Sequence, residues 1–386
     1  MMTQANSEPY RQALVSSMQT RGSVRSDTII QAFLRIPREA FVPFFYQRRP
    51  ASRKLEWERL DSSHEQYLEL IYRDEPLVTR VDERGWPISS SSQPSVMALM
   101  LEALDLKSGQ HVLEIGTGTG YNAALLATIT GQPEHVTTVD INPQITAHAQ
   151  RALHTVIGPG VHVFLGDGIF GYDAKGPYER IIATASAPTI PSAWLHQLAP
   201  GGKLVMDLQG SLASSLLVLE KQGQSVNGML FDTPLYFMPL ISDHIAHPSA
   251  HIDYARYLRQ PCREAAHLEK EHPFPLLLQQ DAFRWFLQWN IPGCQIRERE
   301  LSGKQEKHIF LIDSRRQTIL RFLQEERGWQ VSVYGPQPLW TDVQHLYEQW
   351  KQAGKPEKRS DYAVQIQGKS IILSTAHLII PLAENA

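Results

Sequence analysis

The chain has 386 residues, of which 42% are hydrophobic and 20% are charged, a composition typical of a globular protein with a sizeable core. At this length we expect two domains, or one domain with a large appendage. The formal net charge of −3 gives no general attraction to nucleic acid or to anionic lipid, and we expect neither as a partner.

Cysteine usage and the start of the chain bear on the cellular compartment. Cys262 and Cys294 form neither a disulfide framework nor a metal-ligand spacing, which suits a reducing environment. The first residues lack the basic and apolar segments of a signal peptide. No apolar run approaches the ~20 residues of a membrane-spanning helix. We therefore expect a cytoplasmic protein without a membrane segment.

The N-terminal part predicts helices followed by a polar segment. Residues 10–45 have the pattern of two helices, the second ending at Ile36, because a residue before proline avoids the helical conformation. Residues 47–65 are polar and charged, and we expect them to form a surface excursion.

From residue 111 to about residue 220, strand-like and helix-like segments alternate, which predicts a doubly wound, Rossmann-like α/β domain. Several of the strands are continuously apolar, as in a parallel sheet that is covered on both faces. The predicted strands are Val112–Ile115, Val136–Asp140, Val161–Leu165, Arg180–Thr184, Lys203–Asp207 and Leu216–Leu219.

The remainder, residues 243–386, predicts a smaller α+β accessory domain. Residues 243–275 look like a connecting region with a helical piece. A helix is expected from a capping box formed by Thr341 and Gln344, and it ends before Gly354. Its predicted apolar face is Val343, Leu346, Tyr347 and Trp350. The predicted strands are Ile309–Asp313, Trp329–Tyr334, and a hairpin of Ala363–Gln367 with Ser370–Leu373.

A glycine-rich turn follows the first of the α/β strands. In the sequence Glu114-Ile115-Gly116-Thr117-Gly118-Thr119-Gly120, the glycines let the backbone approach a ligand closely, and the following helix offers free N–H groups. The turn lacks the Lys-Ser/Thr pair of a P-loop, and its third glycine comes one residue early for the dinucleotide fingerprint. The pattern is that of S-adenosylmethionine-dependent methyltransferases, with a nucleotide-binding or merely structural turn as alternatives.

Acidic residues follow the next two strands. Asp140 can accept hydrogen bonds from both hydroxyls of a ribose, although it could also cap the helix that begins near Asn142-Pro143. Asp167 and Gly168 lie where ligands gather in such sheets and could receive an adenine amine, but Asp-Gly alone would be a turn.

Further motifs occur along the chain: Ile36 to Pro43, Tyr72 to Leu77, Ser92-Gln93-Pro94, Gly166-Asp167-Gly168, Pro177 to Pro188 and Leu198 to Val205. In this order they resemble the protein-L-isoaspartate O-methyltransferases, and the resemblance covers roughly residues 10–242. In that family the serine before Gln-Pro lies beside the transferred methyl group, and Ser92 is the matching position. The resemblance implies a methyltransferase domain in residues 1–242 with its glycine-rich core in 105–220.

The resemblance and the residue patterns together predict the site. S-adenosylmethionine is the expected cofactor, S-adenosylhomocysteine the product, and no metal is expected. Ser92 is the predicted catalytic residue, holding a carboxylate that is already ionised at neutral pH and needs no general base. The predicted cofactor contacts are Glu114, Gly116, Thr117, Gly118, Gly120, Tyr121, Asp140, Ile141, Asp167 and Gly168. The predicted substrate contacts are Ser90, Ser91, Gln93, Ala185, Ser186 and Ala187.

A histidine-rich segment carries the densest group of possible metal ligands. His244, His247 and His251 are interpreted as a solvated helix or loop rather than a metal site.

Two departures from the repair enzymes bear on the substrate. A run of serines at 89–92 replaces the usual residues before Gln-Pro, and the chain continues well past Tyr236 to Leu240, after which repair enzymes end. Both features resemble the branch that modifies ribosomally made peptides. We therefore expect methylation of an aspartate side chain in a peptide, the ester then cyclising to a succinimide (aspartimide), with the accessory domain binding the peptide. The alternatives are repair of isoaspartyl residues in damaged proteins, and a non-catalytic peptide-binding module.

Overall fold

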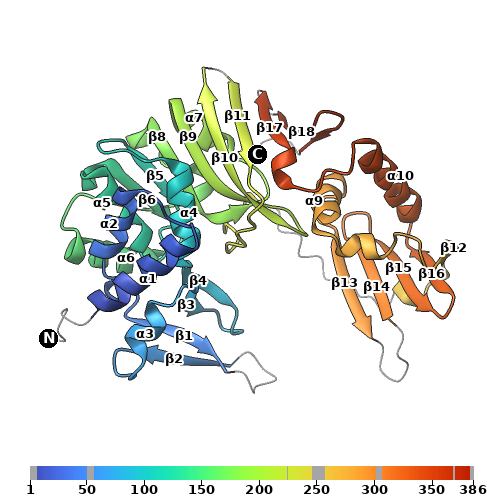
Figure 1. Cartoon of the computed structure of the whole chain (residues 1–386), viewed down its shortest axis with the longest axis horizontal. Helices are drawn as coiled ribbons and strands as arrows, with labels where there is room; N and C mark the ends of the chain where they lie inside the picture. The colour runs from blue at the N-terminus through green and yellow to red at the C-terminus, as the bar shows by residue number, and fades with distance from the viewer. Residues whose placement is uncertain are drawn as a thin grey trace.

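The computed structural model describes residues 7–49, 56–223, 225–245, 257–300, 307–367 and 370–382. An α/β sheet occupies the centre of the molecule, with an N-terminal helical and sheet region on one side and a smaller α+β region on the other (Figure 1). Among the described residues, no helix combines the length and apolar character that crossing a bilayer requires.

The central sheet contains ten strands in the order β19-β18-β17-β11-β10-β9-β8-β5-β6-β7. Its five strands from β9 to β7 are parallel, and the reversal of strand order at β5 makes the sheet doubly wound. These strands are β5 (Val112–Ile115), β6 (Val136–Asp140), β7 (His162–Leu165), β8 (Tyr178–Ala187) and β9 (Leu198–Gln209).

Helices cover both faces of the parallel strands because successive strand residues point to opposite sides. Val112 packs in one core with helices of the N-terminal half, whereas Leu113 packs in the other core with Trp194. The helices around the sheet are α4 (Pro94–Leu104), α5 (Tyr121–Thr130), α6 (Pro143–Val156) and α7 (Ser192–Gln197). Short 3-10 turns connect them: η3 (Pro133–His135), η4 (Gly168–Phe170) and η5 (Asp173–Lys175).

The N-terminal region adds helices and a separate antiparallel sheet of order β2-β1-β3-β4. The expected surface excursion at 47–65 is described only in part, because residues 50–55 lie outside the described ranges. On either side of that gap the chain forms the paired strands β1 and β2, so the expectation of a simple excursion is incomplete. The elements are α1 (Glu8–Thr20), α2 (Asp27–Arg35), η2 (Arg38–Ala40), β1 (Phe44–Arg48), β2 (Trp57–Asp61), α3 (Tyr67–Ile71), β3 (Leu77–Val81) and β4 (Pro87–Ser91).

Strands β10 (Ser214–Gln222) and β11 (Ser225–Leu230) complete this part of the sheet. All six predicted α/β strands are present, but the last, β10, runs antiparallel to β9. The reason is the short turn between them, since only antiparallel strands can be joined without a crossover.

The C-terminal region contains a five-stranded antiparallel sheet of order β12-β16-β15-β14-β13, which packs with α9 and α10. Its strand β12 lies where only a connecting region was expected. The elements are β12 (Glu264–Glu269), η6 (Leu276–Gln279), α9 (Asp281–Asn290), β13 (Gln295–Glu300), β14 (Lys307–Asp313), β15 (Thr318–Glu325), β16 (Gly328–Tyr334), α10 (Leu339–Gln352) and η7 (Arg359–Asp361).

Helix α10 begins earlier than predicted. It starts at Leu339 with Pro338 as the N-cap, so Thr341 and Gln344 lie inside the helix and the expected capping box is wrong. A proline supplies no side-chain cap, and burial of Leu339 and Trp340 accounts for the earlier start. The predicted apolar face is confirmed, with Val343 and Trp350 buried and Leu346 and Tyr347 packed beside them.

The last strands cross the division expected at residue 242. The predicted hairpin is present as β17 (Ala363–Gln367) and β18 (Ser370–Ser374), and β19 (Ile379–Pro381) follows. Because β17 pairs with β11, one hydrogen-bonded sheet contains segments from both expected domains (Figure 1). Whether residues 1–242 and 243–386 fold as separate domains stays a prediction.

Helix α9 joins the two regions through a buried glutamine. Gln288 is 1% exposed, and its Oε1 accepts hydrogen bonds from the backbone N–H groups of Leu212 and Ala213, at 2.9 and 2.8 Å. These amides lie in the turn between β9 and β10, so the side chain fixes α9 against the central sheet.

Replacing Gln288 tests whether its hydrogen bonds to the turn stabilise the protein. Gln288→Met leaves two amides of the turn without their acceptor, and we expect the free energy of unfolding to fall by about 2–4 kcal/mol in urea titrations. The matched control is Gln279→Met, because the Gln279 side chain is exposed and donates to exposed Glu298; its effect should stay within about 0.5 kcal/mol. Equal stability of the two variants would contradict the inference that Gln288 fixes α9 against the central sheet.

Candidate functional site

A cavity of about 400 Å³ lies at the carboxyl ends of β5, β6 and β8. Such an edge, next to the point where strand order reverses, is where open α/β sheets bind ligands. Four segments supply its walls: the glycine turn after β5, the end of β6, the serine-rich end of β4, and residues 237–241. The predicted site residues that line it are Ser90, Ser91, Ser92, Glu114, Gly116, Thr117, Gly118, Tyr121, Asp140, Ile141, Gly168 and Ala185.

The glycine turn is built from left-handed backbone conformations. Gly116, Gly118 and Gly120 have φ values of +94°, +52° and +85°, which L-residues with a side chain rarely adopt. A Cβ atom at Gly116 would lie 3.0 Å from Thr184 Oγ1, so a side chain there would crowd the cavity wall. The N–H groups of Gly116 and Thr117 both donate to the carbonyl of Val139, which ties the turn to β6.

Asp140 closes the turn from the end of β6. Its Oδ2 accepts a hydrogen bond from Gly118 N–H at 3.0 Å, and its Oδ1 accepts one from Asn142 N–H. Burial raises the pKa of Asp140, and the hydrogen bonds from the backbone oppose that rise. The cap of α6 is Asn142, whose Oδ1 accepts from Gln144 and Ile145, so Asp140 does not serve as the helix cap. Its carboxylate instead lines the cavity.

Glu114 is a fully buried carboxyl group beneath the turn. Its Oε1 accepts a hydrogen bond from Asn122 Nδ2 at 2.7 Å, and its Oε2 accepts one from Thr138 Oγ1 at 2.6 Å. Burial raises the pKa of Glu114 to about 7, although these two hydrogen bonds favour the ionised form. The group therefore connects β5, α5 and β6 directly behind the cavity wall.

The serine-rich wall depends on a residue that was not identified as functional from the sequence. Arg38 is completely buried, and within the described residues it has no carboxylate in ion-pair contact. Its Nε donates to Ser91 Oγ, and its Nη2 donates to the carbonyls of Ser91 and Ser92. Further bonds run to carbonyls of residues 71, 73 and 75. The guanidinium therefore fixes the backbone on which Ser92 sits.

Residues 237–241 form the remaining wall. The Ser186 N–H donates to the carbonyl of Met238, and the Leu240 N–H donates to the carbonyl of Ser186. The Phe237 N–H donates to Asp207 Oδ2 at 2.9 Å. From the sequence, the segment Tyr236 to Leu240 was known only by its resemblance to the last strand of the repair enzymes, and nothing in its residues predicted that it lies at the cavity.

Five predicted site residues are not among those that line the cavity, and their direct ligand contacts stay predictions. Asp167 caps η4 and accepts from Ser242 Oγ, while Ser186 holds residues 237–240. Gln93 donates to Asp74 and Ser95, Ala187 is buried in the core, and Gly120 packs against Ala149. Lining residues that the sequence missed include Met97, Asn122, Val139, Asn142 and Thr184.

The histidine-rich segment is only partly described. His244 packs edge-on against Phe170, with ring centroids 5.0 Å apart. His247 and His251 lie outside the described residues. A search of the described ranges finds no group of three or more His, Cys, Asp or Glu side chains arranged to hold a metal ion.

Glu114 predicts a pH-dependent stability. The folded protein raises its pKa from 4.5 to about 7, so the group holds its proton more tightly when folded, and stability falls as pH rises through that window. Glu114→Gln cannot ionise. We expect its stability relative to the unsubstituted protein to increase between pH 4.5 and 8 by about 3 kcal/mol, measured by urea unfolding at both pH values. Parallel pH profiles for the two proteins would refute the raised pKa.

Comparisons with known proteins agree with this geometry. The family model for protein-L-isoaspartate(D-aspartate) O-methyltransferase matches residues 53–245. The protein-L-isoaspartate O-methyltransferase of Hyperthermus butylicus is 34% identical over 242 residues, covering 61% of this chain and 89% of that protein. Its counterpart from Staphylothermus marinus is 35% identical over 243 residues, covering 61% and 96%.

A solved structure of a protein-L-isoaspartate O-methyltransferase is similar over nearly the whole chain. It is 25% identical, covers 95% of this chain and 99% of its own, and superposes with a TM-score of 0.55. The chain therefore belongs to the protein-L-isoaspartate O-methyltransferase family and is an S-adenosylmethionine-dependent protein carboxyl O-methyltransferase.

Proposed function

We propose that this enzyme methylates the free carboxylate of L-isoaspartyl residues in proteins and peptides, the first step of their repair. The observation that supports this most is the cavity itself, which has a glycine turn and Asp140 on one wall and Ser90 to Ser92 on another. Relatives that carry the isoaspartate methyltransferase name cover the same region. The family assignment leaves no support for the non-catalytic module.

The residues of the cavity fit a nucleoside-containing cofactor. Gly116 and Gly118 leave room that a Cβ atom would take, and Asp140 provides carboxylate oxygens at the position suited to ribose hydroxyls. S-adenosylmethionine, when bound, supplies an electrophilic methyl group on a sulfonium sulfur. Gly116, Gly118, Asp140 and Ile141 are the residues proposed to hold it.

The protein's own task is then to bind and orient a carboxylate. With a pKa near ~4, that group is ionised at neutral pH, so neither Glu114 nor another base has to remove a proton. Ser92 is proposed to donate a hydrogen bond to one carboxylate oxygen, which leaves the other directed into the cavity. Arg38 keeps the serine backbone fixed, and residues 237–241 help to exclude water.

Two features favoured modification of a ribosomal peptide: the serine run at 89–92 and the long C-terminal region. The second feature does not distinguish such a peptide from an isoaspartyl protein substrate. A solved protein-L-isoaspartate O-methyltransferase aligns with 95% of this chain, so a long C-terminal region also occurs in a protein of that name. The expectation that such enzymes end after the Tyr236 to Leu240 segment is wrong for that relative. The serine-rich run at 89–92 remains as the observation that favours an aspartate in a constrained peptide.

A substrate panel separates the two functions. We expect radiolabelled methyl transfer from S-adenosylmethionine to an isoaspartyl peptide and little transfer to its aspartyl counterpart. A constrained peptide that contains ordinary aspartate serves as the third substrate. Methylation of that constrained peptide alone would overturn the repair proposal and support tailoring.

Paired substitutions test the proposed roles of the two walls. Ser92→Ala should lower kcat by about 10- to 100-fold, the value of one hydrogen bond to a charged group, while the Kd for S-adenosylmethionine changes little. Asp140→Ala should instead raise that Kd by a similar factor or more, because it removes the acceptor for the ribose. Calorimetry and steady-state kinetics measure both, and an equal loss of cofactor binding in the two variants would refute the assignment.

A further inference from the structure

The wall formed by residues 237–241 belongs to a longer segment that runs to the C-terminal region. We call residues 231–242 the strap. It follows β11 and contains no helix or strand, only an isolated bridge between Pro239 and Ser186. Its second half lines the cavity, and its first half lies at the junction with η7. The strap therefore connects the site to the part of the chain that the proposed chemistry does not use.

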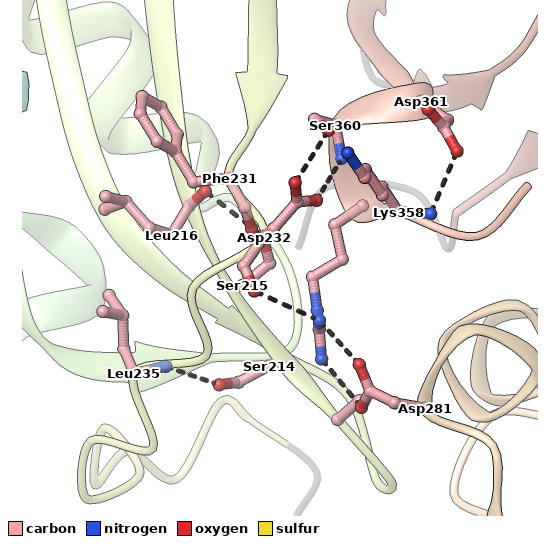
Figure 2. Close-up of polar contacts among 12 residues, drawn as sticks. Ser214, Ser215, Leu216, Phe231, Asp232, Leu235, Asp281, Lys358, Ser360 and Asp361 are labelled. Atoms are coloured by element: carbon pink, nitrogen blue, oxygen red, sulfur yellow. Dashed lines mark hydrogen bonds and ion pairs between the residues drawn. The ribbon is translucent and has the colours of Figure 1, made fainter.

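Side chains of the central sheet hold the first residue and the middle of the strap. Ser215 Oγ donates to the carbonyl of Phe231 at 2.7 Å, and Ser214 Oγ accepts from the N–H group of Leu235 (Figure 2). Ser214 Oγ also accepts from the N–H group of Tyr236. Tyr236 has a φ of +55°, a left-handed conformation that L-residues avoid. Such a backbone persists only where its surroundings fix it on both sides.

The C-terminal region holds the beginning of the strap. The Asp232 carboxylate accepts two hydrogen bonds from Ser360, one from its N–H and one from its Oγ, both at 3.1 Å (Figure 2). Ser360 is itself held in η7, where the Asp361 carboxylate accepts from the N–H groups of Glu357 and Lys358. The turn is thus arranged to present Ser360 to Asp232.

Arg359 anchors the same turn to α9. Its guanidinium, almost fully buried, forms an ion pair with both carboxylate oxygens of Asp281, at 2.7 and 3.0 Å, and lies over the Trp285 ring. Burial raises the pKa of Asp207, which holds Phe237, to about 6. The hydrogen bonds from Phe237 and Ser214 oppose this rise, and the charge of Arg359 opposes it to a smaller extent. The C-terminal region therefore acts on the strap at Asp232 and also influences the carboxylate that fixes its cavity side.

We propose that the C-terminal region positions a wall of the cofactor cavity, with Asp232 and Ser360 as the positioning residues that act through the strap. Neither residue lines the cavity, so neither is catalytic. Without their contact, the start of the strap keeps its hydrogen bonds to Ser215 and Leu216 but loses the two that Ser360 donates to Asp232. The segment that leads to Tyr236 and the cavity wall is then less firmly held. The proposal rests on the cavity being the cofactor site, as in the proposed function.

The test compares full-length variants by two measurements that need no turnover. Asp232→Ala should make the backbone amides of residues 235–240 exchange with deuterium about tenfold faster, as expected for the loss of two hydrogen bonds. It should also raise the Kd for S-adenosylhomocysteine several-fold in calorimetry. Asp232→Asn keeps one acceptor and should give intermediate values. The control is Glu348→Ala, which removes an exposed contact with Lys351 on α10 and should change neither quantity.

Steady-state kinetics then distinguish a contact that positions the cavity wall from one that only stabilises the fold. We expect Asp232→Ala to raise KM for S-adenosylmethionine several-fold with kcat nearly unchanged. The proposal is overturned if Asp232→Ala lowers Tm but leaves exchange in the strap and cofactor affinity equal to those of Glu348→Ala. It is also overturned if exchange accelerates and affinity does not change. Failure of the unsubstituted enzyme to methylate isoaspartyl peptides would refute the proposed function, while exchange and affinity still decide this proposal.

Discussion

The turn between β5 and α5 is the constraint on which the rest of the site depends. Its three left-handed glycines bring the chain from the sheet into α5 without a side chain over the end of β5. The turn is held by the carbonyl of Val139 and the carboxylate of Asp140, so β6 fixes its shape. Beneath it, the buried carboxyl of Glu114 joins β5, β6 and α5. The open volume at this edge of the sheet follows from that backbone path.

The other walls come from segments outside the parallel strands. The serine-rich end of β4 belongs to the N-terminal sheet and is fixed by Arg38, a buried cation satisfied by carbonyl and hydroxyl oxygens. The strap follows β11 and takes its hydrogen bonds from side chains such as Ser214 and Asp207. The sheet therefore provides one half of the cavity, and the added segments complete it.

Local patterns predicted the parts of the fold that local physics determines. The limits of β5 and β6 agree with the expected strands, because short apolar runs between turn residues are buried on both faces. The glycine turn and Asp140 lie at one cavity for the same reason, since parallel strands end at a common edge. The pairing of β17 with β11 had no local signal, and it places C-terminal strands in the central sheet.

The site residues that the sequence missed depend on contacts between distant segments. Arg38 looks like an ordinary charged residue in its helical context, and only its bonds to Ser91 and Ser92, more than fifty positions away, show its role. The strap lacks regular structure, so periodicity could not place it. The length of the C-terminal region suggested a special substrate, but its hydrogen bonds to Asp232 also bring it into contact with the strap.

The cavity is proposed to bring a cofactor and a carboxylate together between the glycine turn and the serine-rich wall. A crystal structure of the protein with S-adenosylhomocysteine and an isoaspartyl peptide tests this directly. We expect ribose hydroxyls in hydrogen-bond contact with Asp140, and the free carboxylate of the isoaspartyl residue in contact with Ser92. Cofactor density outside this cavity, or a peptide carboxylate held away from the serine-rich wall, would contradict it.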